Sequence, residues 1–208
     1  MSDLPSPPRT HAELLAAIPA EVLEHDCGCG SAWRRAREGE TAIDLGCGSG
    51  KTCFLLSQVV GRSGSVIGVD ASAEMLDVAR FHQEAVARAV DGANVRFIEA
   101  RIEDLGRAGG SGPLVADGCA DLVVLDCVLT FVQARERGAI LAEAMRLLRP
   151  GGRLEVADIV GADLEGLRAS LEGSGFEHFE MERSDVAHRV IDGIPRFATT
   201  MRARRKPA

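Results

Sequence analysis

The chain has 208 residues and a net charge of −7, and 46% of its residues are hydrophobic against 26% that are charged. These values are typical of one globular domain with a sizeable core, and the acidic balance argues against a nucleic-acid partner. No apolar run reaches the roughly 18 residues of a membrane-spanning helix. The N-terminus, Met-Ser-Asp-Leu-Pro, does not resemble a secretory signal. We therefore expect a soluble, cytoplasmic protein with reduced thiols and no membrane partner.

The first part of the chain predicts a small helical segment. After a proline-rich start, helical periodicity appears in Ala12–Ile18 and again in Glu21–Glu24. The stretch Cys27-Gly-Cys-Gly30 follows, and its two glycines favour a turn over a helix. We expect residues 1–38 to form a helical cap over a sheet or a site, and residues 39–208 to form the main domain.

The stretch from residue 41 to residue 52 carries the most informative pattern. A short apolar strand, about 41–45 and interrupted by Asp44, leads into three alternating glycines and then into a helix over about 51–60; the glycines are Gly46, Gly48 and Gly50. A doubly wound α/β sheet holds a nucleotide-like ligand with this succession of strand, glycine turn and helix. An acid before the loop repels phosphate but suits an ammonium group, which favours S-adenosylmethionine over a dinucleotide. Cys47 lies between two of the glycines, where a small side chain suffices, so we interpret its role as structural and count it, with Asp44, among the residues of the cofactor-binding loop.

A second acid follows at the end of the next predicted strand, about 65–69. This residue is Asp70, and an acid at the carboxyl end of such a strand can accept both ribose hydroxyls of an adenosine. The alternative is that Asp70 caps the helix that begins at Ala73, but Ser72 caps that helix equally well. We expect Asp70 to bind adenosine, with Ala71 and Met75 beside it.

The third predicted strand, 94–98, leads into a loop that can close over the adenine ring. Ile102 would supply an apolar face, and Glu103 or Asp104 would accept a hydrogen bond from the exocyclic amine. A solvated loop whose acids point to water explains these residues equally well.

The rest of the chain continues the alternation of strands and helices. The fourth strand is almost entirely apolar, as in a buried parallel strand, and it ends in Asp126, another cofactor-binding candidate, and Cys127. Alternation with short turns implies a parallel sheet, which two final strands would close in antiparallel fashion. The expected ranges are a strand at 121–125, a helix at 135–148 that stops at Pro150-Gly151-Gly152, a strand at 153–157, a helix at 162–172, and strands at 176–184 and 196–204.

Three motifs, taken together and in order, resemble those of class I S-adenosylmethionine-dependent methyltransferases. They are Ile43-Asp-Leu-Gly-Cys-Gly-Ser-Gly50, Val69-Asp70 and Leu147-Leu-Arg-Pro-Gly-Gly152, and the likeness covers about residues 41–160. The resemblance implies an α/β fold: a Rossmann-like, seven-stranded sheet with helices on both faces and the cofactor at the strand ends. It also implies methyl transfer as the activity.

A narrower resemblance points to arsenite methyltransferases. The loop from Asp44 to Gly61, including Cys53, is similar to the cofactor loop of that family. The family has a cysteine in a Tyr-Gly-Cys-Gly stretch before the domain and a second one after the fourth strand, which match Cys29 and Cys127 here. The resemblance implies that these thiols, with Cys27 as a third donor, bind trivalent arsenic, which is normally held by three thiolates.

Departures from that family leave the methyl acceptor open. The family carries an insert with another cysteine after the fifth strand, whereas here Ala157–Gly161 passes almost directly into a helix and no cysteine follows Cys127. A small molecule methylated on oxygen, nitrogen or sulfur is therefore the alternative to arsenic, and a non-catalytic cofactor- or metalloid-binding protein is a third interpretation. His25 is the candidate base for an acceptor that must lose a proton. The missing insert also leaves open a homodimer in which the partner subunit completes the site.

Overall fold

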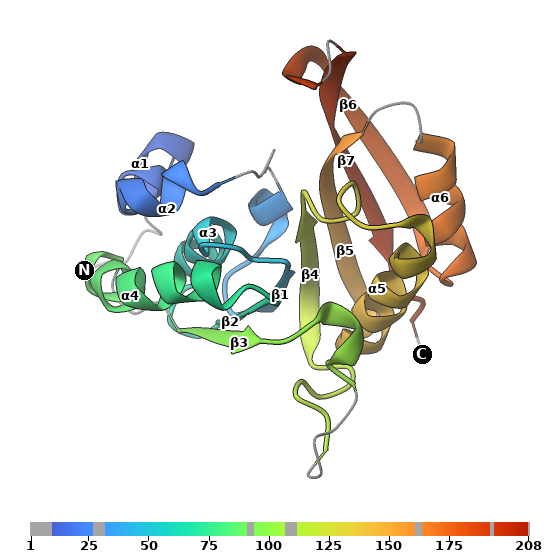
Figure 1. The fold of residues 1–208 in the computed structure, drawn as a ribbon. Coiled ribbons are helices and arrows are strands. Elements are labelled where there is room, and N and C mark those ends of the chain that lie inside the picture. The colour runs from blue at the N-terminus through green and yellow to red at the C-terminus, as the bar shows by residue number, and fades with distance from the viewer. Residues whose placement is uncertain are drawn as a thin grey trace, which may run out of the picture.

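The computed structural model of this chain describes residues 10–26, 32–90, 94–106, 112–160, 164–191 and 194–207. They form a seven-stranded sheet with the strand order β3-β2-β1-β4-β5-β7-β6 (Figure 1). The strands are β1 (Thr41–Leu45), β2 (Ser65–Asp70), β3 (Val95–Glu99), β4 (Ala120–Asp126), β5 (Leu148–Val160), β6 (Glu177–Ile191) and β7 (Ile194–Arg204).

The order of the strands in the sheet reverses at β1, because β2 and β3 lie on one side of it and β4 and β5 on the other. Strand β1 pairs in parallel with β2 on one side and with β4 on the other, so that Asp44 lies level with both Gly68 and Val124. Strands β3 and β5 extend the parallel part, and β7 and β6 close it in antiparallel fashion. The carboxyl ends of β1, β2 and β4 therefore meet at a topological switch point, where open α/β sheets bind ligands.

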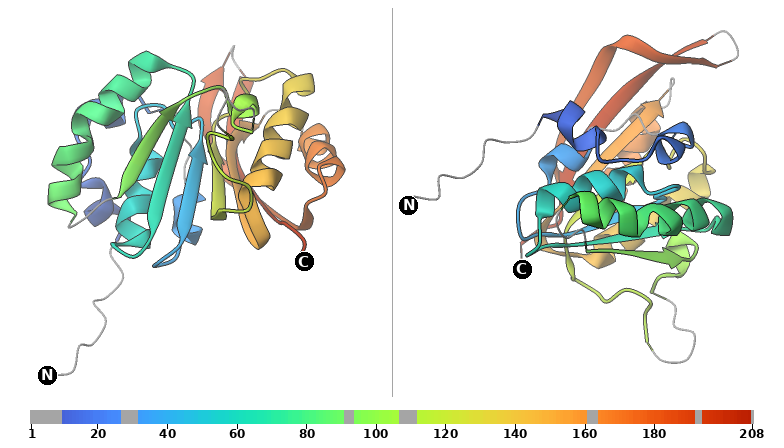
Figure 2. Two further views of the ribbon diagram at one scale, coloured as in Figure 1. Left: turned by 90° about the horizontal axis from the view of Figure 1, so that it is seen from below. Right: turned by 90° about the vertical axis from the view of Figure 1, so that its left-hand side faces the viewer.

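Helices cover both faces of the sheet (Figure 2). Strand β4 shows why, because its successive side chains point to opposite faces: Leu122 and Val124 join one core, whereas Val123 and Leu125 join the other. The first core contains α1 (His11–Leu15), α2 (Ala20–Glu24), the 3₁₀ helix η1 (Ala32–Arg35), α3 (Lys51–Val60) and α4 (Ala73–Ala89). The second contains the 3₁₀ helix η2 (Ile102–Asp104), α5 (Ala134–Leu147) and α6 (Leu164–Gly173).

The predicted fold class is confirmed, and one local prediction can be checked closely. Ser72 is the N-cap of α4, and its side-chain oxygen accepts a hydrogen bond from the backbone N–H of Met75 at 3.2 Å. This satisfies one of the amides that a helix start leaves without an intrahelical partner. Asp70 is thus not needed as the cap.

Strands β5, β6 and β7 are longer than predicted. The Pro150-Gly151-Gly152 sequence ends α5, but the chain is already extended from Leu148 onward. Hydrogen bonds with the end of the chain maintain this extension, since Gly151 N–H donates to the carbonyl of Arg205 and Arg205 N–H donates to that of Gly152. Strands β6 and β7 are also longer than predicted, because the two strands pair with each other in antiparallel fashion. None of the helices in the described ranges is both long and apolar enough to span a membrane.

Candidate functional site

A cavity of about 250 Å³ lies at the carboxyl ends of β1, β2 and β4. Residues from these strand ends, from the glycine loop before α3 and from the segment after α2 line it. The predicted site residues that the structure brings together here are His25, Asp44, Gly46, Cys47, Gly48, Asp70, Met75, Asp126 and Cys127.

Two glycines of the loop, Gly46 and Gly48, have different surroundings. Gly46 has a φ of +83°, and a side chain there would place its Cβ 2.5 Å from Cγ2 of Val128. Gly48 also has a positive φ, +52°, but a Cβ there would meet no atom within 4 Å. Gly46 is therefore required by packing, while Gly48 leaves the backbone open for close approach of a ligand.

Asp44 has the properties of a site for a cationic group. Its side chain is buried, and its Oδ2 accepts a hydrogen bond from Sγ of Cys53 at 3.4 Å. Its Oδ1 has no hydrogen-bond partner among the described residues. Burial and the nearby carboxylate of Asp126 raise the pKa of Asp44 to about 8. A buried carboxylate on a cavity wall with an open acceptor position fits an ammonium group and disfavours a phosphate.

Asp70 is held by the backbone around it. Its Oδ2 accepts a hydrogen bond from Gly48 N–H and its Oδ1 accepts one from Ser72 N–H, each at 2.8 Å. A carboxylate oxygen can accept more than one hydrogen bond, so both oxygens retain capacity for a vicinal diol. The arrangement orients Asp70 toward the cavity that the glycine loop borders.

The turn after β4 holds Cys127 in an unfavourable backbone conformation. Cys127 has a φ of +57°, a conformation that is costly for a residue with a side chain. Its N–H donates to the carbonyl of Ala157 at 2.7 Å. The buried carboxylate of Asp158 accepts hydrogen bonds from both N–H and Oγ1 of Thr130, which fixes the same turn to β5. The strain at Cys127 is thus maintained by the surrounding structure.

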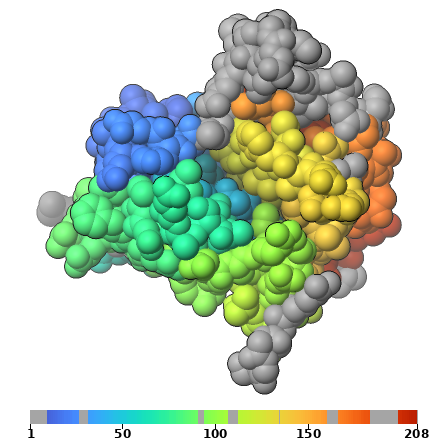
Figure 3. Space-filling model, in the orientation of Figure 1, coloured from blue at the N-terminus to red at the C-terminus, as the bar shows by residue number. Residues whose placement is uncertain are grey.

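The N-terminal helices are attached to the elements that form the cavity. Lys51, at the start of α3, forms an ion pair with Asp26, and both residues line the cavity. Ser49 Oγ donates to the carbonyl of Val22 at 2.9 Å. On the surface, Glu21 of α2 pairs with His82 of α4 at 2.7 Å, and Figure 3 shows the two helices packed side by side.

His25 occupies the edge of this cavity with one ring nitrogen engaged. Its Nδ1 lies 2.8 Å from the carbonyl oxygen of Glu21. Because a carbonyl only accepts, Nδ1 carries the proton and Nε2 of the neutral ring is an acceptor. Cys27 and Cys29, the two predicted thiols that follow His25, lie outside the described residues.

Four predicted cofactor-binding residues are not part of the cavity lining, so their role stays a prediction. Gly50 is the N-cap of α3, and Ala71 follows β2 at the surface. Ile102 packs into the core beside α5, and Glu103 pairs with Arg101. The lining also includes five residues that no sequence motif indicated: Asp26, Ser49, Lys51, Thr52 and Phe131. The position of Lys51 and Thr52 directly after the glycines could have indicated a place at the site, whereas no sequence pattern indicated Phe131.

Two other described cysteines, Cys53 and Cys119, do not line the cavity. Cys53 is fully buried, and burial raises the pKa of its thiol well above the ordinary value. Cys119 precedes β4 at the end opposite the cavity, and partial burial raises the pKa of its thiol as well. Within the described ranges no group of three His, Cys, Asp or Glu side chains is arranged to hold a metal ion.

Comparisons with known proteins agree on one family. The family model described as "Methyltransferase domain" matches residues 36–198. An arsenite methyltransferase of Aquipseudomonas alcaligenes is 40% identical over 206 residues, which cover 93% of this chain and 58% of that protein. The human arsenite methyltransferase is 35% identical over 73% of this chain and 39% of its own length.

A solved structure agrees with these sequence relatives. The crystal structure of CrArsM, an arsenic(III) S-adenosylmethionine methyltransferase from Chlamydomonas reinhardtii, superimposes with a TM-score of 0.76. It is 29% identical, and the match covers 97% of this chain and 75% of that one. The chain spans roughly half the length of the curated relatives it matches, from 39% to 58% of three arsenite methyltransferases.

Proposed function

Because the chain belongs to the S-adenosylmethionine-dependent methyltransferases of this methyltransferase-domain family, we propose that it methylates a small, soft acceptor, trivalent arsenic. The observation that carries the proposal is the common cavity of Asp44, Asp70 and Cys127. In this cavity the two acids suit the ammonium group and the ribose hydroxyls of the cofactor, and the thiol suits a metalloid.

The chain's own residues fit the cofactor. Oδ1 of Asp44, which is buried and has no hydrogen-bond partner among the described residues, suits an ammonium group, which is the charge that the amino-acid end of S-adenosylmethionine presents. Asp70 has acceptor capacity for ribose hydroxyls, and Gly48 leaves room for the ligand between the two acids. We assign Asp44, Asp70 and the glycine loop to cofactor binding on these grounds.

The thiol that supports arsenic as acceptor is Cys127. A strained, rigidly held cysteine on the cavity wall is preorganised to bind a soft atom such as As(III). Asp26 also lines the cavity and immediately precedes Cys27 in sequence. Cys29 is three residues after Asp26 in the sequence, and three residues of chain span at most about 11 Å. We propose Cys29 and Cys127 as the arsenic ligands, with Cys27 as the third donor.

The chemistry places few demands on acid or base residues. S-adenosylmethionine supplies a methyl group on a positively charged sulfur. The side chains of the cavity orient the two reactants, and orientation of this kind accounts for a large part of the rate of a displacement. An As(III) centre has a lone pair, so the chain need not remove a proton from it. His25, with Nε2 as acceptor, would serve as base only for a hydroxyl or amine.

Methyl transfer to arsenite tests the proposal. Purified protein incubated with labelled S-adenosylmethionine, arsenite and a thiol reductant should produce methylated arsenic. Cys127→Ser and Cys29→Ser should each lower the rate by about 100-fold or more, because a hydroxyl is a poor ligand for a soft centre. Cys119→Ser is the matched control and should retain full activity, since Cys119 lies at the other end of β4.

The outcome also separates the alternatives. Turnover of S-adenosylmethionine without arsenic methylation, unaffected by the two serine variants, would point to an organic acceptor. Phe131, which is 68% exposed at the cavity, would then offer a flat surface for such an acceptor. Cofactor binding in calorimetry without any turnover would point to a non-catalytic binding protein.

The setting of the reaction follows from its thiols. Reduced thiols persist in the cytoplasm, where glutathione and thioredoxin keep them reduced, and we propose that compartment for the protein. We also propose a homodimer in which the partner subunit completes the site, because the sequence lacks the insert that the family carries after its fifth strand. Sedimentation with and without cofactor would reveal such a homodimer.

A further inference from the structure

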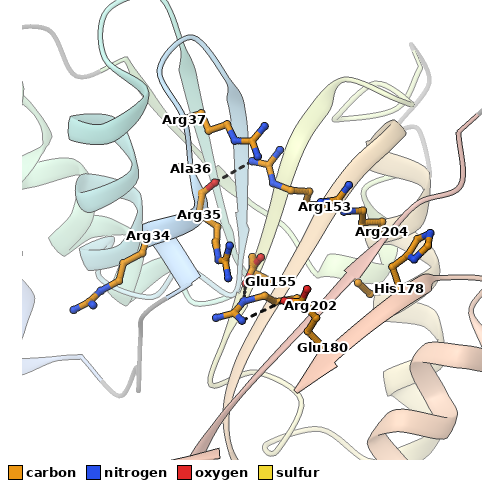
Figure 4. Close-up of a pocket in the computed structure, with 11 residues that line it drawn as sticks. Arg34, Arg35, Ala36, Arg37, Arg153, Glu155, His178, Glu180, Arg202 and Arg204 are labelled. Carbon is orange, nitrogen blue, oxygen red and sulfur yellow. Dashed lines mark hydrogen bonds and ion pairs between the residues drawn. The ribbon is translucent and has the colours of Figure 1, made fainter. Parts of the chain in front are cut away.

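A second and larger cavity, of about 460 Å³, lies between η1 and the β5–β7–β6 part of the sheet (Figure 4). It shares no lining residue with the cofactor cavity. Its Arg153 is level with Leu122 of β4, four residues before Asp126. At the rise of a β-strand this separates the two sites by about 13 Å along β4.

The second cavity is rich in arginine. Six arginines and two glutamates line it, in a chain whose net charge is −7. Two of the arginines are paired within the protein: Arg153 with Glu40 at 2.6 Å, and Arg202 with Glu155 at 3.2 Å. Arg34 instead lies 5.4 Å over the ring of Trp33 and points away from the others (Figure 4).

Three arginines are left with unused hydrogen-bonding capacity. The side chains of Arg35, Arg37 and Arg204 are exposed, and they make no hydrogen bond or ion pair with another described residue. Arg153 lines the same cavity, and its Nε is buried without a hydrogen-bond partner in the described part of the chain. We call these four residues the arginine cavity.

We propose that the arginine cavity binds a phosphate-bearing small molecule. Guanidinium groups match the geometry of phosphate oxygens, and each can donate two parallel hydrogen bonds. Arg37 and Arg204, together with Arg35 near Glu155, place three cations on one concave surface, so a ligand with two or more negative charges would stabilise them more than a single carboxylate would.

The composition of the surrounding surface favours a small ligand over a macromolecule. Glu155, Glu180 and Glu182 lie beside the arginines and pair with Arg202. They interrupt the continuous basic track that a nucleic-acid backbone requires.

Calorimetric titration with inorganic pyrophosphate tests this proposal, with sodium chloride used to hold the ionic strength constant. We expect saturable binding at one site in the wild-type protein. Arg37→Gln combined with Arg204→Gln should weaken it at least tenfold, as the loss of two charge-assisted contacts predicts. The matched control is Arg80→Gln combined with Arg88→Gln on α4, which also removes two exposed arginines and should leave binding unchanged.

Further titrations identify the ligand class and check the fold. Tighter binding of a sugar phosphate than of pyrophosphate would assign the site to an organic phosphate, and the reverse order to a free inorganic anion. S-adenosylhomocysteine should bind the double variant and the wild type equally, because the two cavities share no residue. Arg35→Gln is a second variant in case the double variant does not fold.

Three results would overturn the proposal. The first is no saturable binding beyond that seen with chloride at equal ionic strength. The second is unchanged pyrophosphate affinity in a folded arginine variant. The third is displacement of pyrophosphate by an oligonucleotide or a polyglutamate peptide at much lower concentration, which would assign the surface to a macromolecule. None of these outcomes depends on methyl transfer, so the proposed function stands or fails separately.

Discussion

At the scale of single residues, burial strongly perturbs Asp44 in the cavity at the carboxyl ends of β1, β2 and β4. It is 1% exposed, and the carboxylates of Asp126 and Asp70 and the ammonium group of Lys51 are close enough to affect it electrostatically. Burial, followed by repulsion from Asp126, raises its pKa from 3.8 to about 8. In the absence of a cationic ligand this carboxyl group is therefore largely protonated at neutral pH.

This shift predicts that cofactor binding depends on pH. An ammonium group next to Asp44 favours the ionised form, so binding below about pH 8 releases a proton. Affinity for S-adenosylhomocysteine should rise with pH by at most about tenfold per unit and level off above pH 8. Asp44→Asn should weaken binding and flatten this profile in calorimetry, whereas Asp77→Asn, at an exposed position, should do neither.

The same shift gives a signed prediction for stability without cofactor. A group whose pKa is higher in the folded state contributes stability that is complete below its unfolded value, 3.8, and that is lost as pH rises through about 8. Urea unfolding should show the Asp44→Asn variant gaining on the wild type as pH rises across this window. An equal pH dependence in both proteins would contradict the assignment of the shift to Asp44.

At the scale of elements, the turn from β1 into α3 connects the sheet, the cavity and the N-terminal helices. Its first amides are anchored to β2, because the N–H groups of Gly46 and Cys47 both donate to the carbonyl of Val69. The side of the turn away from the cavity packs against the β4–α5 turn through Val128. Its shape is therefore set by two neighbouring elements rather than by the glycines alone.

Substitution of Gly46 tests this dependence. Gly46→Ala would place a methyl group 2.5 Å from Val128 at a φ of +83°, so we expect a loss of about 1–3 kcal/mol in the free energy of unfolding. Gly138→Ala is the control, since this glycine lies inside α5 and a Cβ there meets no atom within 4 Å. It should stabilise the protein by about 0.5–1 kcal/mol. Chemical denaturation of both variants measures the two effects.

At the scale of the whole molecule, the N-terminal helices share a core with the sheet. Leu14, Val22 and Trp33 are buried in the same cluster as Phe54 and Leu122. A segment whose apolar side chains are buried only against the rest of the domain is expected to unfold with it.

Trp33 is the only tryptophan of the chain and a natural probe of this cooperativity. Its fluorescence should follow the same unfolding transition as circular dichroism, which reports on all the helices. Trp33→Ala, monitored by circular dichroism, should cost about 3–5 kcal/mol, as for a large buried aromatic residue. Phe81→Ala should have almost no effect, because Phe81 is 78% exposed. A fluorescence transition that precedes the other would instead support an independent cap over residues 1–38.

Short-range patterns were enough to predict the sheet, the glycine turn and most of the acids around the cavity. Alternation of apolar strands with helices defines a parallel sheet, and a parallel sheet brings the residues after β1, β2 and β4 to one edge. That is why Asp44, Asp70, Asp126 and Cys127 could be assigned to one site from the sequence. The Ser72 cap is equally local, because its partner is only three residues away.

Other features depend on contacts between distant parts of the chain, and only the tertiary structure decided them. The ion pair of Lys51 with Asp26, the position of Phe131 at the cavity and the strain at Cys127 each require elements far apart in sequence to meet. The arginine cavity is the clearest case, since it joins Arg35 and Arg37 with Arg153 of β5 and Arg204 of β7. In the sequence these arginines look like separate solvated charges, and they share one cavity only because β7 pairs in antiparallel fashion with β5.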